Sequence, residues 1–111
     1  MKIRYRPDNS ACLKYKDLTP GKIYTVIGIE ADDYRILSDQ RRPYLYPPDI
    51  FEIVSEEEPS DWISKYGEEG ESYAYPKELN ESGFFEDYFG GDSRAKMVLQ
   101  AYLTKMQIAQ S

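Results

Sequence analysis

The chain has 111 residues, of which 20 are acidic and 14 basic, and this length fits one domain or a small domain with an appended subdomain. The formal net charge of −6 argues against a nucleic-acid-binding protein, because such a protein presents a basic surface. One cysteine and no histidine exclude an intramolecular disulfide, nearly exclude a zinc site and favour a reducing, cytoplasmic location.

The N-terminal residues predict a short β-structure. Ile3 and Tyr5 alternate with arginines, which indicates an edge strand near residues 2–6. The cluster PDNS at 7–10 predicts a turn, and we expect a second edge strand near 11–16.

Residues 18–54 predict a small antiparallel β-barrel, because strong strand formers alternate there with Gly, Pro and Asp clusters. The first strand of this stretch contains the apolar residues Ile23, Val26 and Ile27. Further strands are expected at 34–37, 43–46 and 51–54. Turns are expected at 19–21, 31–33 and 39–42, and a proline-marked corner precedes the last strand.

This stretch resembles the Src-homology-3 barrel family. The run Leu18, Gly21, Ile23 and Val26 is similar to that family's leucine–glycine–valine pattern after its first loop. The segment 45–51 (LYPPDIF) is similar to its closing segment, in which a proline corner and a single helical turn precede the last strand. The resemblance implies an Src-homology-3-like barrel. The resemblance indicates less about function, because this sequence lacks the tryptophan and the acidic first loop with which the family's peptide-binding members hold their ligands.

The second half of the chain mixes short elements with one long helix. Residues 55–60 form a charged connector, and Ser60 with Asp61 can cap a short helix at 61–66 (DWISKY). A glycine turn at 67–72 then leads to an extended piece at 72–76, followed by a loop or helical turn at 77–83. Asp92 or Ser93 caps the final helix, whose apolar stripe follows a helical period up to Met106.

We therefore predict an α+β fold: a barrel over 1–55, then an acidic aromatic segment and a C-terminal helix over 56–111, packed as one compact unit. The charge is unevenly divided between these parts. Residues 1–55 hold 9 basic and 8 acidic side chains, residues 56–92 hold 2 and 12, and residues 93–111 hold 3 and none.

The acidic aromatic segment is the first candidate site, because aromatic anchors ringed by charge are typical of protein-binding surfaces. It carries eight aromatic residues between Trp62 and Phe89. The expected contact residues are Asp61, Trp62, Tyr66, Glu68, Glu69, Glu71, Glu86, Asp87 and Tyr88. In the alternative interpretation Trp62, Phe84, Phe85 and Phe89 are core. We favour that alternative for the phenylalanines, which are costly to expose, and leave both interpretations open for the acids.

A second candidate is an aromatic groove on the barrel, formed by Tyr34, Tyr44, Tyr46 and Pro47. In the resembled family the matching region presents such a groove to partners. Strand alternation puts Tyr44 and Tyr46 on one face. We favour an interpretation in which the C-terminal segment covers this face.

Catalysis is the least favoured class. The carboxylate pairs at 32–33, 68–69 and 86–87 are adjacent in sequence, so their side chains point in different directions and make poor acid–base dyads. A calcium site at 67–71 lacks the alternating acids of known loops. Cys12 has Lys14 and Lys16 nearby, but we expect a small core residue rather than a reactive thiol. We expect no metal and no cofactor.

The function that we expect is a non-catalytic binding protein that presents its acidic half to a basic protein partner. Small acidic proteins of this kind resemble the immunity proteins encoded beside bacterial polymorphic or contact-dependent toxins. That resemblance implies occlusion of a toxin's basic active site by carboxylates. The alternatives are a phage or bacterial adaptor that binds through the barrel tyrosines, and a small enzyme. We expect no nucleic-acid partner and, because no apolar run is long enough, no membrane segment.

Overall fold

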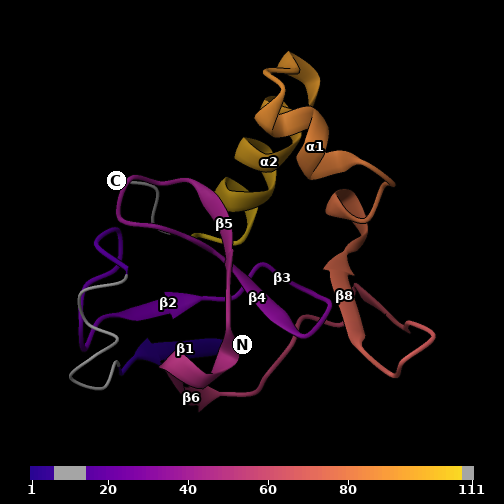
Figure 1. The fold of residues 1–111 in the computed structure, drawn as a ribbon. Coiled ribbons are helices and arrows are strands. Elements are labelled where there is room, and N and C mark those ends of the chain that lie inside the picture. The colour runs from indigo at the N-terminus through magenta and orange to yellow at the C-terminus, as the bar shows by residue number, and fades with distance from the viewer. Residues whose placement is uncertain (7–14, 109–111) are drawn as a thin grey trace.

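The computed structural model describes residues 1–6 and 15–108 of an α+β protein, with eight strands in this part of the chain and helices toward the C-terminal end (Figure 1). The strands are β1 (Lys2–Tyr5), β2 (Ile23–Thr25), β3 (Gly28–Glu30), β4 (Asp33–Leu37), β5 (Pro43–Tyr46), β6 (Phe51–Ser55), β7 (Trp62–Tyr66) and β8 (Ser72–Pro76). The helical elements are two single 3-10 turns, η2 (Pro48–Ile50) and η3 (Lys77–Leu79), and two α-helices, α1 (Phe84–Phe89) and α2 (Ser93–Lys105).

The described strands form two antiparallel sheets. The smaller sheet has the order β2-β1-β6 and the larger one the order β5-β4-β3-β8-β7. The single strand expected to contain Ile23, Val26 and Ile27 is wrong, because Val26 and Ile27 carry the chain from β2 in one sheet to β3 in the other. The Val26 amide donates to the Met1 carbonyl and the Ile27 amide to the Arg35 carbonyl, so successive residues bond to different sheets. Because β8 pairs with β3, the larger sheet contains strands from both predicted parts of the chain, 1–55 and 56–111.

Two hydrophobic clusters lie on opposite faces of the larger sheet. One fills the space between the two sheets, and its members are Ile3, Tyr5, Leu18, Tyr24, Val26, Ile36, Tyr46 and Ile50. The other lies under α1, α2 and η3, and its members are Ile27, Tyr75, Leu79, Phe84, Phe85, Ala95, Leu99, Tyr102 and Leu103. The expectation that Phe84 and Phe85 are core is confirmed. For Phe89 it is wrong, because this residue at the end of α1 is 42 % exposed and stacks on Tyr44.

The predicted helix at 61–66 is wrong, because these residues form strand β7. Trp62 pairs with Pro76 and Tyr66 with Ser72, so β7 and β8 form a hairpin across the glycine turn. Trp, Ile and Tyr favour strands, and five residues make too short a helix to be stable without a partner. The backbone pairing of β7 with β8 therefore stabilises the strand more than capping by Ser60 and Asp61 would stabilise a helix.

The C-terminal helix is confirmed as α2, although it ends at Lys105. Asp92 is its N-cap, and one of its side-chain oxygens accepts a hydrogen bond from the Ala95 amide at 2.9 Å. The single helical turn after the proline corner is present as η2. The turn expected at 7–10 and Cys12 lie outside the described residues, as does most of the strand expected at 11–16. Of the described helices, none combines the length and apolar character needed to cross a membrane.

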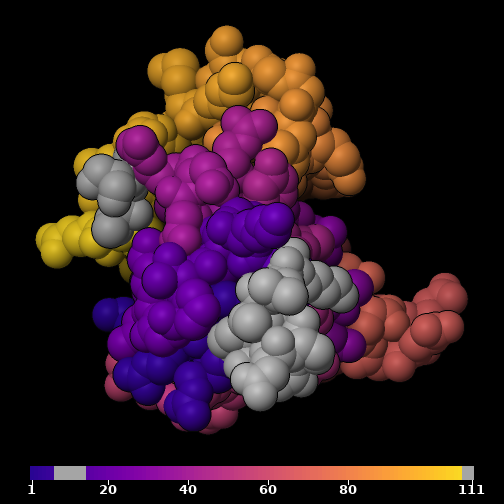
Figure 2. Space-filling model, turned by 60° about the vertical axis from the view of Figure 1, so that its left-hand side comes forward, coloured from indigo at the N-terminus to yellow at the C-terminus, as the bar shows by residue number. Residues whose placement is uncertain are grey.

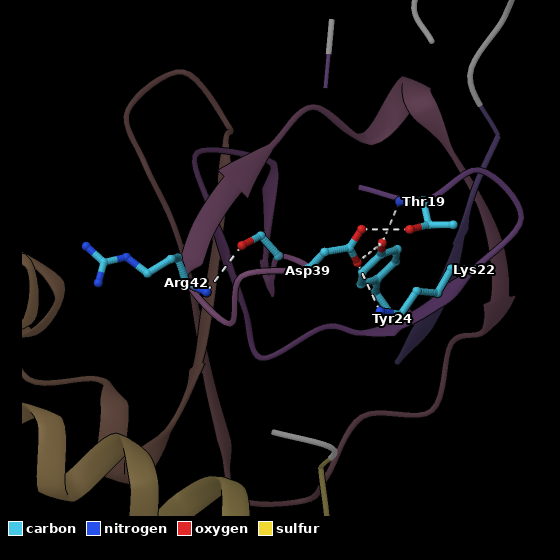
Figure 3. Close-up of polar contacts among 6 residues, drawn as sticks. Thr19, Lys22, Tyr24, Asp39 and Arg42 are labelled. Atoms are coloured by element: carbon cyan, nitrogen blue, oxygen red, sulfur yellow. Dashed lines mark hydrogen bonds and ion pairs between the residues drawn. The ribbon is translucent and has the colours of Figure 1, made fainter. Parts of the chain in front are cut away.

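A carboxylate at the start of the β4–β5 turn ties this turn to the chain before β2 (Figure 3). Asp39 accepts hydrogen bonds from the Thr19 hydroxyl at 2.6 Å, the Tyr24 hydroxyl at 2.8 Å and the Lys22 ammonium at 2.9 Å. Partial burial opposes the charge on Asp39, but these donors together hold its pKa below the ordinary value. Burial, together with the Asp39 charge, raises the pKa of Tyr24 to about 12.

The Tyr24 pKa predicts a loss of stability in alkali. The hydroxyl keeps its proton more tightly in the folded chain than in the unfolded chain, whose tyrosines titrate near pH 10. The contribution of this hydroxyl to the free energy of unfolding is therefore complete below pH 10 and is lost as the pH rises toward about 12. In urea titrations over this range, Tyr24→Phe should show a shallower decline in the free energy of unfolding than the wild type. Equal slopes would contradict the prediction.

A close approach between β3 and β8 requires glycine at position 28. A Cβ atom placed on Gly28 would lie 2.1 Å from Cε1 of Tyr75, whose ring is buried in the cluster under α1. At Gly67 an added Cβ would meet only the flexible carboxylate of Glu71.

We therefore expect Gly28→Ala to lower the free energy of unfolding by about 2–3 kcal/mol, because the Tyr75 ring must move within a packed core. Gly67→Ala is the matched control and should change it by less than about 1 kcal/mol. Urea denaturation of both variants checks this, and equal effects would show that the contact to Tyr75 is not restrictive.

Candidate functional site

A cleft of about 400 Å³ lies between the β3–β8 part of the larger sheet and the segment that runs from η3 into α1. We call it the acidic cleft. Its lining residues are Glu30, Arg35, Lys65, Tyr73, Tyr75, Leu79, Asn80, Glu81, Ser82, Gly83, Phe84, Phe85, Glu86 and Phe89. Strand pairing explains why residues from β3, β7 and β8 line the cleft together. Tyr73 of β8 pairs with Glu30 of β3 on one side and with Lys65 of β7 on the other.

The floor of the cleft holds a buried charge, the guanidinium of Arg35. Its Nε donates to the Tyr75 hydroxyl at 2.8 Å, its Nη1 to the Pro43 carbonyl at 2.6 Å and its Nη2 to Glu30 at 3.2 Å. The Tyr75 hydroxyl also donates to Glu30 at 2.8 Å. Burial raises the pKa of Tyr75, although the Arg35 charge favours its ionised form.

The aromatic lid over this charge comes from α1. The Arg35 guanidinium carbon lies 3.9 Å from the centre of the Phe85 ring, close enough for a cation–π contact. Phe85 in turn packs on Tyr75 at 5.4 Å between ring centres. Arg35 therefore has three hydrogen-bond acceptors and an aromatic ring around its guanidinium, and these contacts fix the floor of the cleft.

The rim of the cleft is acidic and aromatic. Glu81 and Glu86 are exposed, and neither makes an ion pair with any residue in the described ranges. Phe89 is 42 % exposed and Tyr73 half-buried beside them. Lys65 is the one exposed cation among the lining residues, and its Nζ lies 6.0 Å from the Tyr73 ring centre. Carboxylates beside exposed rings can hold a cationic side chain.

The tip of the β7–β8 hairpin continues from one wall of the cleft and projects from the body of the molecule (Figure 2). It carries four of the predicted contact residues: Tyr66, Glu68, Glu69 and Glu71. Tyr66 is 75 % exposed, and none of the three glutamates makes an ion pair with a described residue. The rim of the cleft thus carries two unpaired acids, Glu81 and Glu86, and the hairpin tip carries three more that do not themselves line the cleft, counted over the described residues.

The other predicted contact residues do not all join this site. Glu86 lines the cleft, whereas the neighbouring Asp87 is exposed on α1 and lines no cavity described for the molecule. Asp61 and Trp62 lie at the opposite end of β7, where the Asp61 charge acts on Tyr102 and Lys105 of α2. Trp62 is half-buried against the cluster between the sheets.

Tyr88 lies apart from the acids. It is half-buried and lines a second hollow together with three cationic side chains, Arg41, Arg42 and Lys96. Its ring meets Phe89 edge-on, with 5.2 Å between the ring centres.

The tyrosines of the second predicted site form a packed surface rather than an open groove. Tyr46 is 3 % exposed and donates a hydrogen bond to Asp17, while Tyr34 and Pro47 are half-buried. Tyr44 stacks on Phe89 of α1, with 5.5 Å between ring centres and 5° between ring planes. The ring of Phe89 therefore covers part of the Tyr44 face, as we expected of the C-terminal segment.

Sequence reasoning missed Glu30, Tyr73, Glu81 and the exposure of Phe89 as parts of a site. Glu30 and Tyr73 come together only through the β3–β8 pairing, which joins residues more than forty positions apart. Alternation along β8 does place Tyr73 and Tyr75 on one face, and this was the signal available in the sequence.

The three acids that line the cleft differ in their engagement. Of its acids, Glu30 is already engaged by Arg35 and Tyr75. Among the described residues there is no group of three His, Cys, Asp or Glu that could hold a metal ion. Comparisons of the chain with protein-family models, with curated proteins and with solved structures give no match.

The Arg35 contacts predict that a lysine cannot replace this arginine. Lysine keeps the charge but cannot donate to Tyr75, Pro43 and Glu30 at once. We expect Arg35→Lys to lower the free energy of unfolding by about 2–3 kcal/mol. Arg4→Lys is the control, because the ion pair of Arg4 with Glu52 is exposed and should contribute less than about 1 kcal/mol. Urea denaturation measures both, and equal losses would contradict the assigned role of Arg35.

Proposed function

We propose that this protein is a non-catalytic binding module that holds a basic segment of a protein partner in the acidic cleft. The observation that carries the proposal is the pair of unpaired carboxylates, Glu81 and Glu86, beside exposed rings in one hollow. A lysine or arginine entering there would meet carboxylates and aromatic faces together. The three glutamates of the hairpin tip would attract the same partner and speed its encounter.

The biological form that we favour is an immunity-type inhibitor of a bacterial toxin. A basic active site binds phosphate groups, and carboxylates on a projecting hairpin could occupy it in their place. Tyr66, with 75 % of its surface exposed at that tip, supplies an aromatic anchor of the kind that dominates binding energy in interfaces.

We also propose that residues 1–55 form an Src-homology-3-like barrel. The pairings of β1 with both β2 and β6 support this, as do the β3-β4-β5 meander and the 3-10 turn η2 directly before β6. In this view β7 and β8 extend the barrel's β3 edge and bring the acids of the second half to it.

Charge reversal in the cleft tests the binding proposal. The probe is a short lysine- and arginine-rich peptide, titrated by calorimetry at low and at high salt. We expect Glu81→Lys with Glu86→Lys to weaken binding at least about tenfold and to reduce its salt dependence, since two attractive charges become repulsive.

The matched control is Asp49→Lys with Glu57→Lys, which changes the net charge equally at exposed sites outside the cleft. Its affinity should stay within about twofold of the wild type. If the two double variants weaken binding alike, the attraction comes from net charge alone and the cleft is not the site.

A further inference from the structure

A second hollow of about 630 Å³ lies between the β4–β5 turn and the helices α1 and α2. We call it the cationic groove. It is lined by Leu37, Gln40, Arg41, Arg42, Tyr88, Lys96, Leu99, Gln100 and Leu103. None of these residues lines the acidic cleft, so the two hollows are separate sites.

The charge of the cationic groove has one sign. Three of its lining residues, Arg41, Arg42 and Lys96, are exposed cations, and no carboxylate lines it. None of the three makes an ion pair with any residue of 1–6 or 15–108. A hollow whose charged lining residues are all cations attracts an anion.

The backbone at Arg41 is held in a conformation that arginine disfavours. Its φ is +63°, in the left-handed region where glycine or asparagine is easier to accommodate, and the cost is about 1–2 kcal/mol. The Arg41 amide donates to the Ser38 carbonyl at 2.8 Å, and the Ser38 amide donates to the Arg42 carbonyl at 2.9 Å. Arg41 therefore occupies a turn position that glycine would adopt without this strain.

The turn that carries both arginines is fixed by its neighbours. Asp39 anchors its first part through Thr19, Lys22 and Tyr24, and the Arg42 side chain extends away from this cluster (Figure 3). The Arg42 guanidinium carbon lies 5.9 Å from the Phe89 ring centre. The backbone that carries Arg41 and Arg42 is therefore in place before a ligand arrives, which lowers the entropic cost of binding.

The floor of the groove is apolar. Leu99 and Leu103 of α2 are buried and Leu37 of β4 is half-buried, with Tyr88 at the side. A small inorganic anion would contact the cations and leave this floor uncovered. A long polyanion would be repelled by the net charge of −6 elsewhere on the protein. A short segment that carries both carboxylates and an apolar side chain would use the rim and the floor together.

We propose that the cationic groove is a second binding site, which takes a carboxylate-rich peptide segment with an apolar side chain. Arg41, Arg42 and Lys96 bind its carboxylates, and its apolar side chain lies on Leu99 and Leu103. This site is independent of the acidic cleft. It would bind an acidic partner, whereas the cleft would bind a basic one.

The test uses a short peptide of glutamates around one leucine, titrated into the full chain by calorimetry. We expect Arg41→Gly to weaken its binding about tenfold, while the melting temperature is unchanged or higher because the backbone strain is relieved. Lys96→Gln should also weaken binding. Arg94→Gln is the matched control, because Arg94 is exposed on the same helix but does not line the groove. Its affinity should remain within about twofold of the wild type.

The specificity of the groove is tested with three further titrations. A peptide with serine in place of the leucine should bind several-fold more weakly, and inorganic phosphate and a single-stranded oligonucleotide should bind more weakly still. Glu81→Lys with Glu86→Lys should not weaken binding of the acidic peptide, which separates this site from the acidic cleft. The proposal is overturned if Arg41→Gly and Arg94→Gln bind the peptide equally well, or if the oligonucleotide binds more tightly than the peptide.

Discussion

The buried guanidinium of Arg35 is the constraint on which the rest of the structure depends. A charge inside a protein is tolerated only when its donors are satisfied, and Arg35 reaches Tyr75 on β8, the Pro43 carbonyl on β5 and Glu30 on β3. Phe85 of α1 closes over it. One side chain on β4 thereby fixes three other strands and a helix relative to each other. The acidic cleft has its shape because these elements cannot separate without exposing or orphaning that charge.

The helix α1 contributes residues to both hollows, the acidic cleft and the cationic groove. Glu86 and Phe89 line the acidic cleft, and Tyr88 between them in sequence lines the cationic groove. The stacking of Phe89 on Tyr44 holds this six-residue helix against β5. Residues adjacent in the chain thus line different hollows, because successive positions on a helix point in different directions.

Local patterns predicted much of this fold. The turns after Glu30 and Leu37, the strand at 43–46, the turn after the prolines and the Asp92 cap are all set by residues within a few positions of each other. The helix expected at 61–66 failed because its sequence is compatible with both structures, and only the pairing of Trp62–Tyr66 with Ser72–Pro76 decides between them. For the site, sequence reasoning grouped the acids of 61–87 by proximity in the chain. The structure groups them by strand register, which brings Glu30 to the site and leaves Asp61 at the far end of β7.

The pairing of β8 with β3 has a consequence for the order in which the chain acquires its structure. A ribosome delivers Gly28 and Arg35 well before Tyr75 and Phe85, so the emerging N-terminal half carries an arginine whose hydroxyl partner and aromatic cover have not yet been made. Closure of this long loop is entropically slow compared with formation of the local hairpins. The acid-lined hollow is therefore among the last features to mature, and a nascent chain paused before residue 72 has not yet formed it.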